Sequence, residues 1–358
     1  MERYFRGKKL IDREEEIKFF LDWFEGLPEQ ILWIYGPKSS GKTTLIEYVV
    51  EKELFEDFEK LKPKGNYWVK YLNLRRKLIS SYETFLEAFI KPRSKKSKKQ
   101  EKLSARISAG IFEIRGEILN EVKERKKDLF DVLLNELENV TKENKKPILI
   151  IDEIQTLEEI YINGDKELLK EFLNFCVALT KEIHISHVVI LSSNTIFIDR
   201  IYNDAKLKKT SHFYKIDHLG KDIVVEWLRG EGFRKEEIDL IWEYLGGCIP
   251  DIQRVLFAKK EYKTIKEYLE HEAFLAYTQM VMFYHQENFS KEEIEIFEKI
   301  CREILLKGNY IIKKEDNSKI LKVISKWAEK EILFFDPLSI EVTANSRIYE
   351  KGMEKLVS

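Results

Sequence analysis

A glycine-rich stretch that carries a lysine and two threonines is the part of the sequence best suited to bind phosphate. It reads GPKSSGKTT over residues 36–44 and fits the pattern GxxxxGK[ST] without a gap. Glycines let backbone N–H groups turn inward around a phosphate, and the N-terminus of a following helix adds partial positive charge. The sequence therefore predicts a nucleoside triphosphate site formed by Gly36, Pro37, Lys38, Ser39, Ser40, Gly41, Lys42, Thr43 and Thr44.

Within this loop two side chains have chemistry of their own. Lys42 can reach the β- and γ-phosphates, and the Thr43 hydroxyl can ligate Mg²⁺. A second chemical motif is an apolar run that ends in two carboxylates, Asp152 and Glu153. Asp152 is the predicted partner of Mg²⁺, together with Thr43, and Glu153 is the predicted base that orients and deprotonates the attacking water. We therefore predict an ATPase whose catalytic residues are Lys42, Asp152 and Glu153.

Both motifs follow apolar runs that are typical of buried parallel strands. Residues 31–35 precede the glycine-rich loop, and residues 148–151 precede the two carboxylates. Further strands are predicted at 67–74, 187–193 and 211–216, with helical patterns between them. The predicted fold class is α/β, a parallel sheet with flanking helices that binds its ligand at the carboxyl ends of the strands.

Composition limits the remaining choices. A chain of 358 residues is long enough for two or three domains. The 62 basic and 63 acidic residues balance, so no global charge draws the chain to nucleic acid or membrane. The three cysteines have no metal or redox spacing and are expected to be reduced, buried thiols. No signal peptide or long apolar span is visible, so a cytoplasmic protein is expected.

Several sequence motifs resemble those of STAND-type ATPases, the signalling members of the AAA+ branch of P-loop NTPases. These motifs are Arg13-Glu14 before a helix upstream of the loop, the sequence IDEIQ at 151–155, and a Gly-Gly turn ending at Pro250. The resemblance implies base and ribose contacts from Ile11, Asp12 and Arg13, and adenine packing by Pro250. Without it, Asp12 is a helix N-cap and the Gly-Gly turn is an ordinary helix stop.

AAA+ relatives also place a polar residue, sensor 1, near the γ-phosphate at the end of a strand. Ser193 and Asn194 occupy that position here, and helix capping explains them equally well. The resemblance implies three domains: an AAA+-like P-loop core at 1–216, a helical lid at 217–288 and a winged helix at 289–358.

Two lysine-rich features favour a DNA-associated protein instead. Residues 91–106 form a basic insertion with eight bases and one acid. Four lysines share one face of a predicted helix in the C-terminal domain: Lys319, Lys322, Lys326 and Lys330. A solvated surface explains both features, and residues 290–358 contain 13 basic and 13 acidic residues.

The resemblance thus implies an archaeal-type STAND switch that binds ATP/ADP with Mg²⁺ and hydrolyses ATP slowly. Its nucleotide state would control domain arrangement, a protein partner or self-assembly. The alternative is a DNA-associated AAA+ ATPase of the replication-initiator or transposition-helper kind. A metabolic P-loop enzyme is a third alternative, which has no need of a lid proline or a winged helix.

Overall fold

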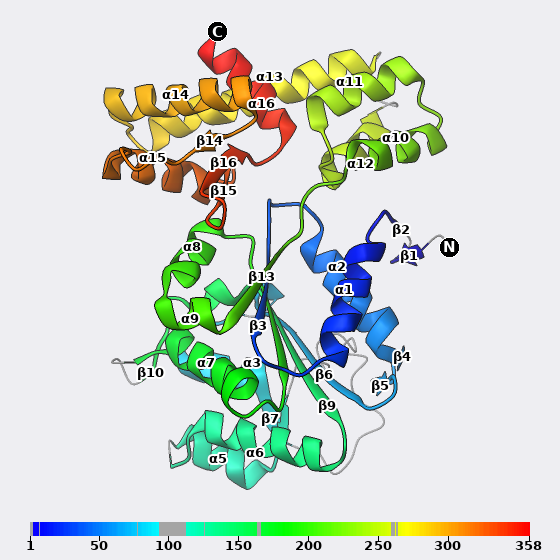
Figure 1. The fold of residues 1–358 in the computed structure, drawn as a ribbon, viewed down its shortest axis with the longest axis vertical. Coiled ribbons are helices and arrows are strands. Elements are labelled where there is room, and N and C mark those ends of the chain that lie inside the picture. The colour runs from blue at the N-terminus through cyan, green and yellow to red at the C-terminus, as the bar shows by residue number, and fades with distance from the viewer. Residues whose placement is uncertain are drawn as a thin grey trace.

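The structure, a computed structural model, describes residues 3–6, 8–76, 78–92, 112–124, 126–162, 166–258, 262 and 264–358. Its centre is a five-stranded sheet in the order β13-β3-β12-β9-β6 (Figure 1). The strands are β3 (Ile31–Tyr35), β6 (Tyr67–Asn73), β9 (Lys146–Asp152), β12 (His187–Leu191) and β13 (Ser211–Lys215). Every neighbouring pair in this sheet is parallel, so the predicted α/β class is confirmed.

The burial of the strands explains their sequences. All residues of β3 and β12 are buried, because helices cover both faces of the sheet. Alternate residues of β3 point to opposite faces: Leu32 and Ile34 join one apolar cluster, and Ile31, Trp33 and Tyr35 join the other. β6 is buried only at Val69, Tyr71 and Leu72 and half-buried elsewhere, as expected of a strand at the edge of the sheet.

Helices on the two faces complete these clusters. One face is covered by α1 (Glu14–Glu25), α2 (Lys42–Tyr48) and the π-helical turn η1 (Val49–Leu54). The other face is covered by α3 (Tyr82–Phe89), α5 (Gly116–Lys123), α6 (Leu129–Lys142), α7 (Leu168–Val177), η4 (Ala178–Glu182), α8 (Thr195–Asn203) and α9 (Ala205–Lys209). The carboxyl ends of the strands are left clear of these helices, at the end of the sheet where the glycine-rich loop lies (Figure 1).

The remaining elements of this part of the chain are short. They are β1 (Arg3–Phe5), β2 (Lys8–Leu10), β4 (Phe55–Asp57), β5 (Lys62–Pro63), η2 (Leu74–Arg76), β7 (Ile90–Pro92), β8 (Phe112–Ile114), η3 (Ile154–Leu157), β10 (Tyr161–Ile162) and β11 (Lys166–Glu167). The predicted basic insertion begins inside β7, which pairs in parallel with β8, so its first residues are part of a strand. Residues 93–106 lie outside the described residues.

Four helices follow the sheet and form an apolar cluster of their own. They are α10 (Lys221–Gly230), α11 (Lys235–Leu245), α12 (Ile249–Ala258) and α13 (Ile265–Gln286), called here the four-helix segment. Gly247, in the turn before α12, is packed so tightly that a Cβ would lie 1.9 Å from the carbonyl oxygen of Leu219. Only glycine fits this position. The Gly-Gly turn is therefore needed for close packing against Leu219 as well as for ending the preceding helix.

The last part of the chain, called here the C-terminal segment, covers residues 291–358. Its elements are α14 (Lys291–Lys307), β14 (Tyr310–Ile311), α15 (Ser318–Glu329), β15 (Leu333–Asp336), β16 (Glu341–Ala344) and α16 (Arg347–Val357). The strands form an antiparallel sheet in the order β14-β16-β15. Trp327 stacks on Phe297 with ring centroids 3.6 Å apart, at the centre of a separate apolar cluster.

The C-terminal segment packs against the end of the parallel sheet (Figure 1). Phe334 joins an apolar cluster of the sheet, and Ile196 of α8 packs against the cluster of the C-terminal segment. The buried Asp336 accepts a hydrogen bond from the Tyr35 hydroxyl, at 3.2 Å, and lies 3.3 Å from the Lys215 ammonium. Two strands of the sheet, β3 and β13, therefore hold the C-terminal segment by a shared buried carboxylate.

The three cysteines are free thiols, and each lies in a different part of the chain. Cys176 is on α7, Cys248 is in the turn before α12, and Cys301 is on α14. All three are buried, which confirms the prediction of buried, unpaired thiols, and burial raises the pKa of each well above its ordinary value.

His187 gives a prediction about stability and pH. It is 3% exposed, its Nε2 lies 3.2 Å from the carbonyl oxygen of Gly26, and burial lowers its pKa to about 4. The unfolded chain therefore binds a proton below the ordinary pKa of about 6.5 that the folded chain does not bind until about 4. We expect the free energy of unfolding to fall by up to about 1.4 kcal/mol per pH unit as the pH decreases across this window.

Chemical denaturation of the parent and of His187→Gln at several pH values measures this contribution. The difference in the free energy of unfolding between the parent and His187→Gln should shrink as the pH falls from about 6.5 to about 4. His271→Gln, which alters an exposed histidine, is the matched control and should track the parent. A difference between parent and His187→Gln that is independent of pH would contradict the assignment.

Candidate functional site

The glycine-rich loop joins the end of β3 to the start of α2 in the conformation that a phosphate loop needs. Gly36 has φ +142°, and a Cβ there would lie 2.1 Å from the carbonyl oxygen of Ile216. Gly41 has φ +92° and is the residue before α2. Both glycines are therefore required, one by a close backbone approach and both by positive φ. The free N–H groups at the start of α2 form an anion site.

Next to the loop is a cavity of about 470 Å³, which contains most of the predicted nucleotide residues. Those that line it are Ile11, Arg13, Lys38, Ser39, Gly41, Lys42, Thr43, Thr44, Asp152, Glu153, Ser193 and Pro250. Gly36, Pro37 and Ser40 support the loop from behind, since all three accept hydrogen bonds from Lys42. The structure thus brings residues of the sheet, the N-terminal stretch and the four-helix segment to one cavity.

Lys42 is almost fully buried beneath the loop. Its Nζ donates to the carbonyl oxygens of Gly36, at 2.9 Å, and Pro37, at 2.7 Å. Burial lowers its pKa to about 8, although Asp152 and Glu153 oppose the shift. A buried ammonium whose hydrogen-bond partners are neutral is strongly stabilised by a nearby anion. A phosphate chain is therefore a ligand that suits Lys42.

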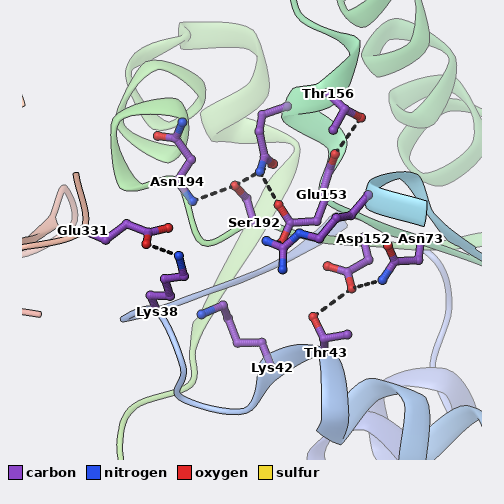
Figure 2. Close-up of polar contacts among 12 residues, drawn as sticks. Lys38, Lys42, Thr43, Asn73, Asp152, Glu153, Thr156, Ser192, Asn194 and Glu331 are labelled. Atoms are coloured by element: carbon purple, nitrogen blue, oxygen red, sulfur yellow. Dashed lines mark hydrogen bonds and ion pairs between the residues drawn. The ribbon is translucent and has the colours of Figure 1, made fainter. Parts of the chain in front are cut away.

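Asp152 ends β9 and accepts hydrogen bonds from three side chains, of which the one from the Tyr71 hydroxyl is the longest, at 3.5 Å. The Thr43 hydroxyl and the Asn73 side-chain amide each donate to its Oδ2, at 2.9 Å (Figure 2). Burial raises the pKa of Asp152 to about 6, and the hydrogen bond from Thr43 opposes the shift. A hydroxyl beside a buried carboxylate is the hard-oxygen donor set that Mg²⁺ prefers, so these residues fit the metal.

Glu153 follows at the end of the same strand and has both carboxylate oxygens occupied. Oε1 accepts from Arg75 Nη2 and Oε2 accepts from Gln155 Nε2, each at 2.5 Å. Its backbone has φ +64°, and its N–H donates to the carbonyl oxygen of Leu191 on β12. Ser192 in turn donates to Gln155 Oε1 at 3.0 Å (Figure 2), so the carboxylate is fixed beside the phosphate loop.

Of the two predicted sensor residues, only Ser193 lines the cavity. Asn194 is the N-cap of α8, and its side-chain oxygen accepts a hydrogen bond from the N–H of Phe197 at 3.0 Å. Asn194 therefore caps the start of α8, the alternative that the sequence left open, and its contact with the nucleotide stays a prediction.

The N-terminal stretch contributes differently from the prediction. Ile11 and Arg13 line the cavity, but the exposed Asp12 does not, and Arg13 rather than Asp12 is the residue before α1. Arg13 is buried and donates to the carbonyl oxygens of Ser40, at 2.9 Å, and Asp217, at 2.8 Å. It thereby ties the phosphate loop to the stretch that leads into α10. Asp12 is not the N-cap of α1, and its contact with the base or ribose stays a prediction.

Several residues of the site were missed by the sequence analysis. Asn73 and Gln155 donate to the carboxylates of Asp152 and Glu153, and the cavity is also lined by Phe5, Arg6, Leu45, Arg75, Ile249 and Gln253. Position was a usable signal for two of them, because Asn73 ends a predicted strand and Gln155 comes two residues after Glu153. Nothing in the sequence points to Phe5, which approaches the cavity from the N-terminal hairpin β1–β2.

The phosphate loop also contacts the C-terminal segment directly. The Lys38 N–H donates to the Asn345 side-chain oxygen at 3.0 Å, and the Lys38 ammonium forms an ion pair with Glu331 (Figure 2). His218 Nε2 lies 2.8 Å from the Asn345 carbonyl oxygen. A residue of the predicted nucleotide site is thus bound to a part of the chain about three hundred residues away.

A phosphate loop and a strand-end Asp-Glu pair on a parallel sheet define a P-loop ATPase. A sequence profile for the ATPase domain found predominantly in Archaea matches residues 10–255. The chain belongs to this family of archaeal-type ATPases.

Individual relatives agree with this assignment. Two are uncharacterized ATP-binding proteins of Methanocaldococcus jannaschii, 32% and 35% identical to this chain, and each match spans 92% of this chain and 94% of the relative. Among solved structures, the Walker-type ATPase of Pyrococcus abyssi aligns over 96% of both chains with a TM-score of 0.60 and 15% identity. The last comparison supports the fold alone.

Proposed function

We propose that this ATPase is a STAND-type molecular switch, in which the bound nucleotide controls the docking of the C-terminal segment. One observation supports the proposal above all: Lys38 of the phosphate loop bonds to Glu331 and Asn345 of that segment. A ligand at the loop therefore changes the surroundings of groups that hold the two parts together.

The proposed domains are a core at 1–216, a helical lid at 217–288 and a winged helix at 289–358. The order α14, β14, α15, β15, β16 supports a winged helix, in which a helix precedes a two-stranded wing. Pro250, at the start of α12, supports the lid because it lines the nucleotide cavity together with Ile249. The adenine then lies against Ile11, Phe5 and Pro250, and the phosphates against α2.

In the proposed reaction, the residues of this chain bind and orient ATP and move one proton. Lys42 neutralises the β- and γ-phosphates, and Thr43 and Asp152 would hold Mg²⁺. The metal supplies charge neutralisation at the phosphate oxygens. Glu153 accepts a proton from the attacking water. Slow turnover is part of the proposal, because a switch uses the nucleotide state to set its domain arrangement and not to perform bulk work.

In the arrangement described here, the C-terminal segment is docked on the phosphate loop. This docked arrangement corresponds to the ADP state. ATP brings additional negative charge to the loop near Lys38, which competes with Glu331 for the ammonium. The Lys38–Glu331 pair is partly exposed and contributes little by itself, so the nucleotide shifts the equilibrium through several contacts together. The released surface is then free for a protein partner or for self-assembly.

Small-angle scattering tests the switch. We expect the Glu153→Gln protein, which holds ATP without hydrolysing it, to show a larger radius of gyration or a higher mass with Mg-ATP than with Mg-ADP. The doubly substituted protein that also carries Lys42→Met is the control, because its weakened nucleotide binding should remove the difference. Identical curves for the two nucleotides in Glu153→Gln would leave an ATPase without a switch.

The DNA-associated alternative is less well supported. Three of the four lysines on and beside α15 are paired with acids: Lys319 with Glu292, Lys326 with Glu293 and Lys330 with Glu287. A face that binds phosphates needs its cations available, and here most of them are already neutralised.

Within the part of the chain that the structure describes, no helix has the length and apolarity needed to cross a bilayer.

A further inference from the structure

Arg75 occupies an unusual position in the nucleotide cavity. It lies in η2, directly after the edge strand β6, and its side chain is 63% exposed although it lines the cavity. Its guanidinium donates to Glu153 Oε1 at 2.5 Å. The arginine is therefore bound to the carboxylate that has to be available for catalysis.

The other cationic side chains that line the cavity have hydrogen-bond or ion-pair partners other than Glu153. Arg13 donates to two backbone carbonyls and to Glu16, Arg6 is paired with Glu47 and Glu51, and Lys38 is paired with Glu331. Lys42 is buried under the loop. Arg75 alone among these five pairs a largely solvent-exposed side chain with the proposed catalytic base. It is the cation best placed to exchange a partner inside the cavity.

We propose that Arg75 binds the γ-phosphate of ATP and, by leaving Glu153, makes this base available. The inference rests on the proposed function and specifies how its site is regulated. A terminal phosphate carries more charge than a carboxylate and offers an arginine two oxygens, so it competes well for the guanidinium. Once Arg75 has moved, Glu153 retains only the neutral Gln155 amide as a side-chain partner and has one oxygen free for water.

The reaction then proceeds with all atoms accounted for. The water oxygen bonds to the γ-phosphorus as one water proton passes to Glu153 Oε1, and the bond from the γ-phosphorus to the β–γ bridging oxygen breaks. The bridging oxygen keeps the electron pair and leaves as part of ADP, while Arg75 neutralises charge on the transferred phosphoryl oxygens. After phosphate departs and Glu153 loses its proton to solvent, Arg75 returns to the carboxylate. The base is thus exposed only while a γ-phosphate is present.

The test compares binding of two nucleotides to Arg75→Ala by titration calorimetry with Mg²⁺. The probes are ADP and the β,γ-imido analogue of ATP, which carries a γ-phosphate that is not hydrolysed. Loss of a charged hydrogen bond predicts that affinity for the imido analogue falls about 10- to 100-fold, while affinity for ADP changes less than about twofold. We expect kcat for ATP to decrease as well, and Arg75→Lys to restore part of the discrimination.

The adjacent arginine is the matched control. Arg76 is 43% exposed, is paired with Glu47 and does not line the cavity, so Arg76→Ala should keep the parent's ratio of the two affinities. Thermal melting of each nucleotide-free variant checks that it folds. An unchanged affinity ratio in a folded Arg75→Ala protein overturns the proposal, and a rise in kcat shows that Arg75 only restrains Glu153. If Arg75→Ala loses discrimination but the scattering curves above are identical, the switch fails and the role of Arg75 stands.

Discussion

Replacement of Glu153 by glutamine should leave Mg-ATP binding close to that of the parent and reduce turnover by about 100-fold or more, the contribution of a general base. The physical reason is that glutamine keeps the size of the side chain and one acceptor oxygen but cannot accept the proton of water. Gln155 and the left-handed backbone at residue 153 hold the side chain in place in either case. Release of phosphate, followed in single-turnover and steady-state experiments, measures the effect.

Glu158→Gln is the matched control for this substitution. Glu158 lies five residues further along the chain, is paired with Arg200 and is absent from the cavity lining, so its replacement should not alter turnover. If Glu153→Gln lost ATP binding and turnover to the same extent, Glu153 would be a structural residue and not the base.

Replacement of Lys42 should have an effect of similar size, but on binding. Lys42→Ala removes the ammonium that faces the β- and γ-phosphates, and the loss of charged hydrogen bonds predicts about 100-fold weaker binding of Mg-ATP. Lys42→Met keeps most of the buried volume, so it separates loss of charge from loss of packing beneath the loop. Calorimetry with Mg-ATP and thermal melting of both variants give the two readouts.

Lys52→Ala is the control for a lysine outside the site. Lys52 lies in η1, directly after the helix that begins at Lys42, and is exposed. Its replacement should leave nucleotide affinity unchanged. A Lys42→Ala protein that bound and hydrolysed ATP like the parent would refute the phosphate-loop assignment.

The sequence was most informative where local chemistry and burial coincide. Continuous apolar runs predicted β3, β9 and β12 because strands covered on both faces have few polar positions, and here those lie at the strand ends. The glycines of the phosphate loop were recognisable because positive φ and a close approach to Ile216 leave no other choice of residue. Local pattern was ambiguous at Asp12 and Asn194, where one short polar side chain suits a cap and a ligand contact equally.

Contacts between distant parts of the chain could not be predicted in this way. Arg75 and Glu153 are 78 residues apart, and Lys38 and Glu331 are 293 residues apart. In a chain with 35% charged residues, the number of pairings that a sequence permits is far larger than the number a fold selects. The partner of each cation follows from the sheet order and from the docking of the C-terminal segment, neither of which is encoded by local periodicity.

The distribution of the cysteines has a practical consequence for kinetic experiments. One buried thiol lies in the core, one beside the nucleotide cavity in the four-helix segment, and one in the C-terminal segment. Because a thiol reacts only when it is exposed and deprotonated, its alkylation rate reports how often its surroundings open. Mass spectrometry of the three cysteine peptides after timed alkylation can therefore follow the opening of each part of the chain separately, in the parent sequence and without an added label.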